Sequence, residues 1–276
     1  MAAAPGRDAP IGVFDSGIGG LTVLRALEAR LPCERFLYLG DTARLPYGTK
    51  SAASIARYSA QAAGTLVQRG VKCIVVACNT ASAVGLEAVR GRAAGLSVIG
   101  VIEPGAEAAC AATVRHHIAV IATERTVSDG AYQAAIAHRD GSARVSVLAT
   151  PLFVALAEEG VTEGPIAQAV ARYYLEPLFS ASVHEAPDTL VLGCTHFPLL
   201  AGAIGSVLGP GVRIVDSAET TAGAVHAALA ASDLLRRGAT GEVHFLATDS
   251  LERFVRIGSR FFGHAIASGR VELIDL

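Results

Sequence analysis

The sequence predicts an α/β protein built on mainly parallel β-sheets. Short apolar runs typical of buried strands alternate with longer segments of helical spacing, an order that favours parallel sheets covered by helices. This order occurs twice, because each half runs strand, polar turn, helix, strand, helix, strand and then a cysteine. At 276 residues and 51% hydrophobic content, the chain can bury the large core that such a fold needs.

The first half opens with a strand at Ile11–Phe14 and a glycine-rich turn at Asp15–Gly20. Leucines at helical spacing then predict a helix that Pro32 ends. The elements expected after it are a strand at 36–39, a polar loop at 40–50, a helix from Ser51 to Gly70, and strands at 73–77 and 97–101.

The second half restarts the pattern, which places a domain boundary near residues 99–104. Its expected elements are a strand at 118–121, a polar turn at 122–128, a helix containing Tyr132, a strand at 144–148, a loop or short helix at 151–159, a helix at 165–179 and a strand at 190–192. The tail adds a strand at 212–215, a helix from a capping box at Asp216 and Glu219 to about Arg237, a strand at 243–246, a helix near 250–259 and a strand at 271–274.

Composition and charge narrow the class of protein. A net charge of −2 favours neither nucleic acid nor a membrane surface as partner. Residues 1–10 lack the apolar core of a signal peptide, and no uncharged apolar run reaches the ~20 residues of a membrane span. Five cysteines, an odd number without a CxxC pair, predict free thiols in a reducing cytoplasm. We interpret Cys33, Cys73 and Cys110 as core residues.

The other two cysteines stand where predicted strands end. Cys78 lies in IVVACNTAS at 74–82, and Cys194 lies in LVLGCTHF at 190–197. Ligands of open α/β sheets bind at that edge. A helix is expected soon after each cysteine, and the partial positive charge of a helix N-terminus favours the thiolate.

Two opposed thiols suit the removal and return of a proton at the α-carbon of an amino acid, since one thiolate can act as base while one thiol acts as acid. Two like charges about 4 Å apart cost about 4 kcal/mol at an effective dielectric near 20, so an anionic substrate needs hydrogen-bond donors. The candidate donors are Ser16, Asn79, Thr80 and Thr195. Asp15 and His196 are candidates to orient or tune the neighbouring thiols, with structural roles in a turn or the core as the alternatives.

Other chemistries remain open at this point. Zinc could be held by Cys78, Cys194 and His196, although their spacing matches no zinc pattern. A cysteine hydrolase could pair Cys194 with His196, which would leave Cys78 unexplained. The turn at 17–20 matches neither GxGxxG nor a P-loop, so no nucleotide is expected at this site. Lysine, which pyridoxal phosphate enzymes need, occurs only at positions 50 and 72.

Six motifs then give the sequence a family resemblance. They are FDSGIGG at 14–20, GDTARLPYG at 40–48, ACNTAS at 77–82, VIEPG at 101–105, PLFVALAEEG at 151–160 and GCTHFPLL at 193–200. Together they cover nearly the whole chain, which closely resembles the glutamate racemases of the cofactor-independent aspartate/glutamate racemase superfamily. Two positions depart from the family pattern: Ala122 stands where glycine is frequent, and Thr150 where cysteine is frequent.

The resemblance implies two pseudosymmetric three-layer α/β domains, residues 1–99 with 212–276 and residues 100–211, with the active site in the cleft between them. It implies Cys78 and Cys194 as the two proton donors and acceptors, and no metal, nucleotide or other cofactor. The substrate contacts that it implies are Asp15, Ser16, Tyr47, Gly48, Asn79, Thr80, Thr195 and His196. It allows a homodimer, and it connects D-glutamate with peptidoglycan synthesis.

Two alternatives to a glutamate racemase are kept. Aspartate racemases share the two cysteines but commonly carry glutamate after the second Cys-Thr pair, so His196 favours glutamate as the substrate. A non-catalytic amino-acid-binding or regulatory protein is the alternative from another class.

Overall fold

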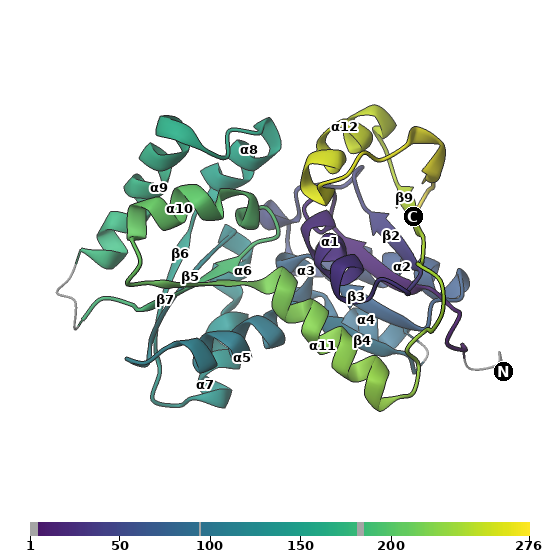
Figure 1. Ribbon diagram of the computed structural model, residues 1–276, viewed down its shortest axis with the longest axis horizontal. Helices are drawn as coiled ribbons and strands as arrows, with labels where there is room; N and C mark the ends of the chain where they lie inside the picture. The colour runs from purple at the N-terminus through teal and green to yellow at the C-terminus, as the bar shows by residue number, and fades with distance from the viewer. Residues whose placement is uncertain (1–4, 94, 181–184) are drawn as a thin grey trace. The chain divides into compact units, whose positions relative to one another are not determined.

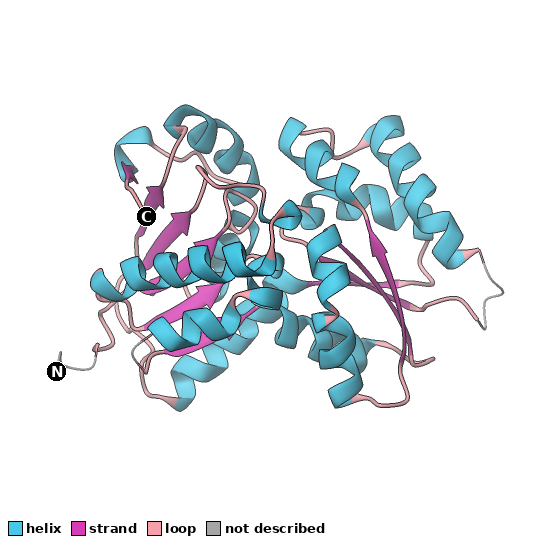
Figure 2. Ribbon diagram, turned by 180° about the vertical axis from the view of Figure 1, so that it is seen from behind, coloured by secondary structure: helices cyan, strands magenta, loops and turns pink. Residues whose placement is uncertain are grey.

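The computed structural model describes residues 5–93, 95–180 and 185–276, so the start of the N-terminal stretch lies outside the described residues. The chain splits into two compact units, Met1–Val101 with Ala218–Leu276, and Ile102–Ser217. Each unit has its own parallel sheet flanked by helices (Figures 1 and 2), which confirms the α/β prediction. None of the described helices is long and apolar enough to cross a membrane.

The first unit contains a six-stranded sheet in the order β10-β9-β2-β1-β3-β4, and every neighbouring pair is parallel. Its strands are β1 Ile11–Asp15, β2 Phe36–Gly40, β3 Cys73–Val76, β4 Ser97–Gly100, β9 Val243–Ala247 and β10 Val271–Leu273. Its helices are α1 Leu21–Arg30, α2 Ala52–Gln68, α3 Asn79–Val84, α4 Leu86–Arg92, α11 Ser217–Ala231 and α12 Leu251–Phe262. Short 3-10 turns lie at Tyr47–Thr49 and Ser268–Arg270.

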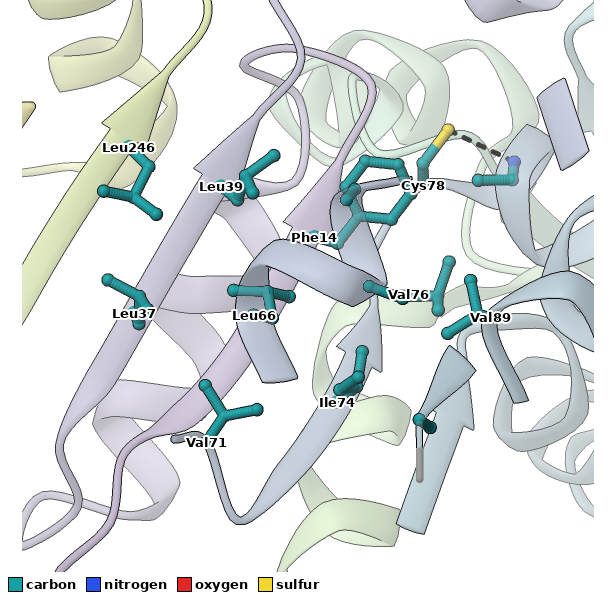
Figure 3. Packing of buried hydrophobic residues seen from close by; sticks show 14 of the residues in the cluster. Phe14, Leu37, Leu39, Leu66, Val71, Ile74, Val76, Cys78, Val89 and Leu246 are labelled. Carbon is teal, nitrogen blue, oxygen red and sulfur yellow. Dashed lines mark hydrogen bonds between the residues drawn. The ribbon is translucent and has the colours of Figure 1, made fainter. Parts of the chain in front are cut away.

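One face of this sheet packs under α2 and α4. Phe14, Leu39, Val76 and Leu246 are register partners on four neighbouring strands, so their side chains form one apolar row (Figure 3). Leu66 of α2 lies in the same core cluster. Continuous apolar strands are what a parallel sheet covered on both faces requires.

The opposite face carries an aromatic cluster beneath α12. Tyr38 and Phe245 are register partners, and the ring of Phe254 lies 6.1 Å and 6.0 Å from theirs. Because side chains alternate along a strand, Tyr38 faces α12 while its neighbours Leu37 and Leu39 face α2.

The second unit contains a four-stranded parallel sheet in the order β6-β5-β7-β8. Its strands are β5 His117–Ala122, β6 Arg144–Ala149, β7 Thr189–Gly193 and β8 Arg213–Asp216. Its helices are α5 Ile102–Ala112, α6 Glu124–Asp129, α7 Ala131–Arg139, α8 Pro151–Glu159, α9 Gly164–Phe179 and α10 Ala201–Leu208, with a 3-10 turn at Phe197–Leu200.

The two sheets share one topology. The order β2-β1-β3-β4 of the first repeats as β6-β5-β7-β8 in the second, so β3 and β7 occupy equivalent places. Cys78 follows β3 and Cys194 follows β7, which agrees with the repeat predicted from the sequence.

Three details differ from the prediction. The strand expected at 212–215 is β8, which pairs with β7 and therefore belongs to the second sheet, although residues 212 onward were assigned to the first domain. The chain returns to the first unit at Ala218. Helix α11 ends at Ala231 instead of near Arg237, and α5 was not predicted.

Candidate active site

Cys78 lies at the switch point of the first sheet, where β1 has β2 on one side and β3 on the other. Phe14 is the register partner of Val76, so the residues that follow β1 and β3 emerge side by side. The Ser16 hydroxyl accordingly lies 3.3 Å from Cys78 Sγ. Crevices at such switch points are the usual ligand sites of open α/β sheets.

Cys78 is also the N-cap residue of α3. Its sulfur accepts a hydrogen bond from Ala81 N at 3.4 Å (Figure 3), and the thiol is 5% exposed. The expected position at a helix N-terminus is therefore present. Asn79 and Thr80, both buried, form the first residues of this helix.

Asp15 ends β1 and organises the glycine-rich turn. Its Oδ2 accepts a hydrogen bond from Gly17 N at 2.8 Å, and the Tyr38 hydroxyl donates to Gly17 O at 3.1 Å. Burial, followed by the charges of Asp15 and Cys78, raises the pKa of Tyr38 well above its usual value, so this hydroxyl stays protonated. A Cβ at Gly40 would lie 2.2 Å from Gly17 O, which is why a glycine ends the neighbouring strand.

Tyr47 belongs to the same edge. Its hydroxyl donates to Asp41 Oδ2 at 2.6 Å, and burial together with Asp41 and the Cys78 charge raises the pKa of Tyr47 strongly. Gly48 follows in the same 3-10 turn and is half-buried. Tyr47 is thus held in place by its neighbours.

Cys194 occupies the equivalent place in the second unit. It follows β7 and is 6% exposed, and Ala122 of β5 is the register partner of Gly193. The sequence predicted a helix N-terminus here, and one is present: a 3-10 turn at Phe197–Leu200 runs directly into α10 at Ala201. Its N-cap is His196, so Cys194 lies two residues before the cap, whereas Cys78 is itself the N-cap of α3.

His196 supplies positive charge at this thiol. Its Nδ1 lies 3.7 Å from Cys194 Sγ and 3.5 Å from Thr195 Oγ1, while its Nε2 lies 3.2 Å from Glu158 Oε1. Burial alone would lower the pKa of His196, but the hydrogen bonds to Cys194 and Glu158 outweigh it and raise the pKa to about 10. The imidazole is therefore protonated at neutral pH.

Further polar groups lie beside Cys194. Tyr132 is buried, and burial, the Cys194 charge and Asp216 raise its pKa far above the usual value. Thr123 directly follows β5, the strand next to β7, and its hydroxyl lies 3.1 Å from that of Thr126. These threonines were not singled out in the sequence, although their place after a central strand was visible there.

Asp41 was also missed. It directly follows β2, is fully buried, and accepts hydrogen bonds from Tyr47 and from the Thr248 hydroxyl at 3.0 Å. The neighbours Glu158 and Glu159 have different surroundings, since Glu158 contacts His196 while Glu159 is exposed.

The remaining cysteines are free thiols; Cys73 is buried as predicted, whereas Cys33 and Cys110 are half-buried and not core residues. Burial raises the pKa of Cys73 to about 12 and also raises that of Cys110, so both stay protonated. Among the described residues, no group of three or more His, Cys, Asp or Glu side chains is gathered for a metal ion.

The structure is that of an α/β protein with two equivalent parallel sheets. At the switch point of each sheet lies one buried thiol with polar residues beside it. Residues 12–225 match the family model for Asp/Glu/hydantoin racemases. The chain belongs to this family and is therefore a racemase, an enzyme of the isomerase class.

Individual relatives agree with that assignment. The chain is 49% identical to a glutamate racemase of Geobacter metallireducens over 92% of each chain. Among solved structures, it matches glutamate racemase from Thermus thermophilus in complex with β-chloro-D-alanine at 45% identity with a TM-score of 0.87. It matches glutamate racemase from Francisella tularensis in complex with D-glutamate at 34% identity with a TM-score of 0.90, and both matches cover 98% of each chain.

Proposed function

We propose that this chain interconverts L- and D-glutamate by proton transfer at Cα, with Cys78 and Cys194 as the two acid/base groups. The observation that carries the proposal is the equivalent placement of two buried thiols in a chain that is 49% identical to a glutamate racemase. A racemase must take a proton from one face of the carbon and deliver one to the other, and a duplicated scaffold offers one thiol for each face.

The proton balance closes with two thiols. From L-glutamate, the Cys194 thiolate takes the α-proton, and the Cys78 thiol then gives its proton to the opposite face. The enzyme is left with Cys194 as the thiol and Cys78 as the thiolate, which is the form that accepts D-glutamate. General acid–base catalysis of this kind contributes typically 10²–10⁴-fold.

The binding groups follow from the geometry at each thiol. The residues next to Cys78 are Ser16, at the end of the neighbouring strand, and Asn79 and Thr80, at the start of α3. Thr195 directly follows Cys194. Each hydrogen bond to a charged carboxylate contributes ~1.5–3 kcal/mol. In this scheme, Tyr47 and Gly48 line the same pocket.

Two charged residues would tune the thiols. His196, protonated and paired with Glu158, offsets negative charge at Cys194. Asp15 acts through the glycine-rich turn that it holds, next to Cys78.

The mechanism requires two domains that bring the sulfurs to one carbon, in a cleft that closes on the substrate. We take the two compact units as these domains, which moves the second boundary from 211/212 to the point after Ser217. No metal, nucleotide or pyridoxal phosphate enters this reaction. We further propose that it takes place in the cytoplasm and supplies D-glutamate for peptidoglycan, with a homodimer as an allowed assembly.

The alternatives make different predictions. A racemase for aspartate or another small acid would prefer that substrate in a panel with chiral readout. A binding protein without activity would bind glutamate saturably, but it would exchange no α-proton with solvent in D₂O. Metal-free protein that incorporates deuterium at Cα would exclude the second alternative.

Cys78→Ser and Cys194→Ser test the assignment of the two thiols. We expect racemisation to fall by about 10²–10⁴-fold in each variant while glutamate binding is largely retained. In D₂O, Cys78→Ser should still exchange the α-proton of L-glutamate through Cys194, and Cys194→Ser should exchange that of D-glutamate. Cys33→Ser and Cys110→Ser, at half-buried free thiols, are matched controls. Full racemisation in either active-site variant would defeat the two-base mechanism.

A further inference from the structure

A depression lies in the first unit, at the edge of the sheet where its strands begin, opposite the edge that carries Cys78. Its volume is about 530 Å³. The residues that line it include Phe36 and Val271, which begin β2 and β10, and Pro10, which precedes β1. Cys78 follows the carboxyl end of β3, so a ligand in this depression would lie outside the thiol site.

The floor of the depression is apolar and its wall is an ion pair. Leu37 and Leu246, on the sheet face that α2 covers, line it and belong to the core cluster. Helix α2 ends at Gln68, and Arg69 then reaches over to Glu272 of β10 with hydrogen bonds of 2.8 Å and 2.6 Å. Because α2 ends at Gln68, the depression stays open beside β9 and β10.

The rim is strongly basic in a chain whose net charge is −2. Arg35, Arg69 and Arg270 line the depression, and Glu272 is the acidic residue among its described lining residues. Glu272 is already paired with Arg69, which leaves Arg35 and Arg270 uncompensated. Within the part of the chain that the structure describes, neither guanidinium has a hydrogen bond or an ion pair.

One further acidic residue, Glu242, lies near the depression. His244 of β9 also lines the depression, and its Nε2 lies 3.6 Å from Glu242 Oε2, both being exposed. An anion that entered would therefore meet two free guanidinium groups, whose planar forks match phosphate oxygens in pairs.

We propose that this depression binds a small organic molecule that carries a phosphate group, with the phosphate on Arg35 and Arg270 and the organic part over Leu37 and Leu246. The volume lies within the ~300–1,000 Å³ of typical ligand pockets, more than a free phosphate ion fills. The apolar floor beside a cationic rim favours a phosphate ester over the inorganic ion.

Titration calorimetry with three probes tests this proposal, in a chloride buffer free of phosphate. Phenyl phosphate should bind at one site per chain, at least ten-fold more tightly than inorganic phosphate or phenol. In the variant Arg35→Gln with Arg270→Gln, its affinity should fall at least ten-fold. The matched control, Arg30→Gln with Arg256→Gln, replaces two exposed arginines outside the depression and should bind as the native chain does.

Three results would overturn the proposal: no saturable binding of phenyl phosphate, unchanged affinity in the double variant, or an equal loss in the control. Equal melting temperatures show that the variants are folded. Arg270→Gln alone, at the exposed end of a 3-10 turn, gives a second measurement if the double variant is unstable. Racemase activity plays no part in the readout, so the outcome does not depend on the proposed function.

Discussion

Glu158→Gln removes the negative charge that lies beside His196. The glutamine side chain has the same size and keeps one hydrogen-bond acceptor. In the native chain, Glu158 Oε1 lies 3.2 Å from His196 Nε2, and the two side chains are 20% and 13% exposed. The imidazolium on its other side lies 3.7 Å from Cys194 Sγ. The substitution therefore tests whether this charged pair serves the second thiol.

The expected size of the effect follows from the contact. Two unit charges at this separation interact by about 5 kcal/mol at an effective dielectric of 20, which is an upper bound because both groups are partly hydrated. A charge-assisted hydrogen bond contributes ~1.5–3 kcal/mol net. Since ~1.4 kcal/mol corresponds to a factor of ten, kcat/KM should fall about 10- to 150-fold. The fall must be equal in both directions, because enantiomers have equal free energies.

The pH profile gives a second readout. The pKa of His196 is raised to about 10, so the native imidazole keeps its proton up to that pH. Without Glu158, the pKa falls toward the ordinary value, and the alkaline limb of the activity profile should move to lower pH. The raised pKa also makes the stability of the fold depend on pH. The His196–Glu158 pair makes its full contribution to the free energy of unfolding below a pH of ~6.5, the pKa of an unfolded histidine, and this contribution is lost as the pH rises through about 10.

Chiral chromatography of glutamate between pH 6 and pH 10.5 measures both effects. Glu159→Gln is the matched control, since this neighbour is exposed and should leave rate and profile unchanged. A native pH profile in Glu158→Gln, or the same loss in the control, would refute a role of the pair in catalysis.

Two further substitutions test how the first unit is held together. Lys72→Met leaves the buried carboxylate of Glu34 without the ammonium group that lies 2.5 Å from it. We expect the free energy of unfolding, measured by urea titration, to fall by ~3–5 kcal/mol. A loss no larger than that of the control Lys50→Met would contradict this. Gly40→Ala places a Cβ 2.2 Å from Gly17 O, so both the melting temperature and kcat/KM should fall. The control Gly91→Ala has open space around the new Cβ and should lower neither value. Equal behaviour of the two variants would contradict the steric argument.

The fold could be predicted because its signals are local. Buried parallel strands are short apolar runs, and each is visible without knowledge of its neighbours. Helix α5 was missed because Pro104 and Gly105 near its start resemble a break, although proline is tolerated in the first turn of a helix. Strand β8 was predicted as a strand but assigned to the wrong sheet, since its pairing with β7 has no local signal.

The residues of the candidate site likewise fall into those with a local sequence signal and those without one. Cys78, Ser16 and Cys194 could be found because each stands next to a strand end, and the sheet topology then brings the first two together. Asp41 and Glu158 could not be assigned in the same way. Their roles depend on partners that are remote in sequence, Thr248 in one case and His196 in the other.

The duplicated scaffold and the unequal surroundings of the two thiols have a joint consequence for the proposed reaction. Cys78 accepts a hydrogen bond from a backbone N–H at a helix start and donates one to the Ser16 hydroxyl oxygen, whereas Cys194 lies beside an imidazolium that is paired with a carboxylate. The two half-reactions therefore need not have equal barriers or equal binding. Because the enantiomers have equal free energies, kcat/KM must nevertheless match in both directions. The chemical asymmetry of the thiols can then appear only as kcat and KM values that differ between L- and D-glutamate by one common factor.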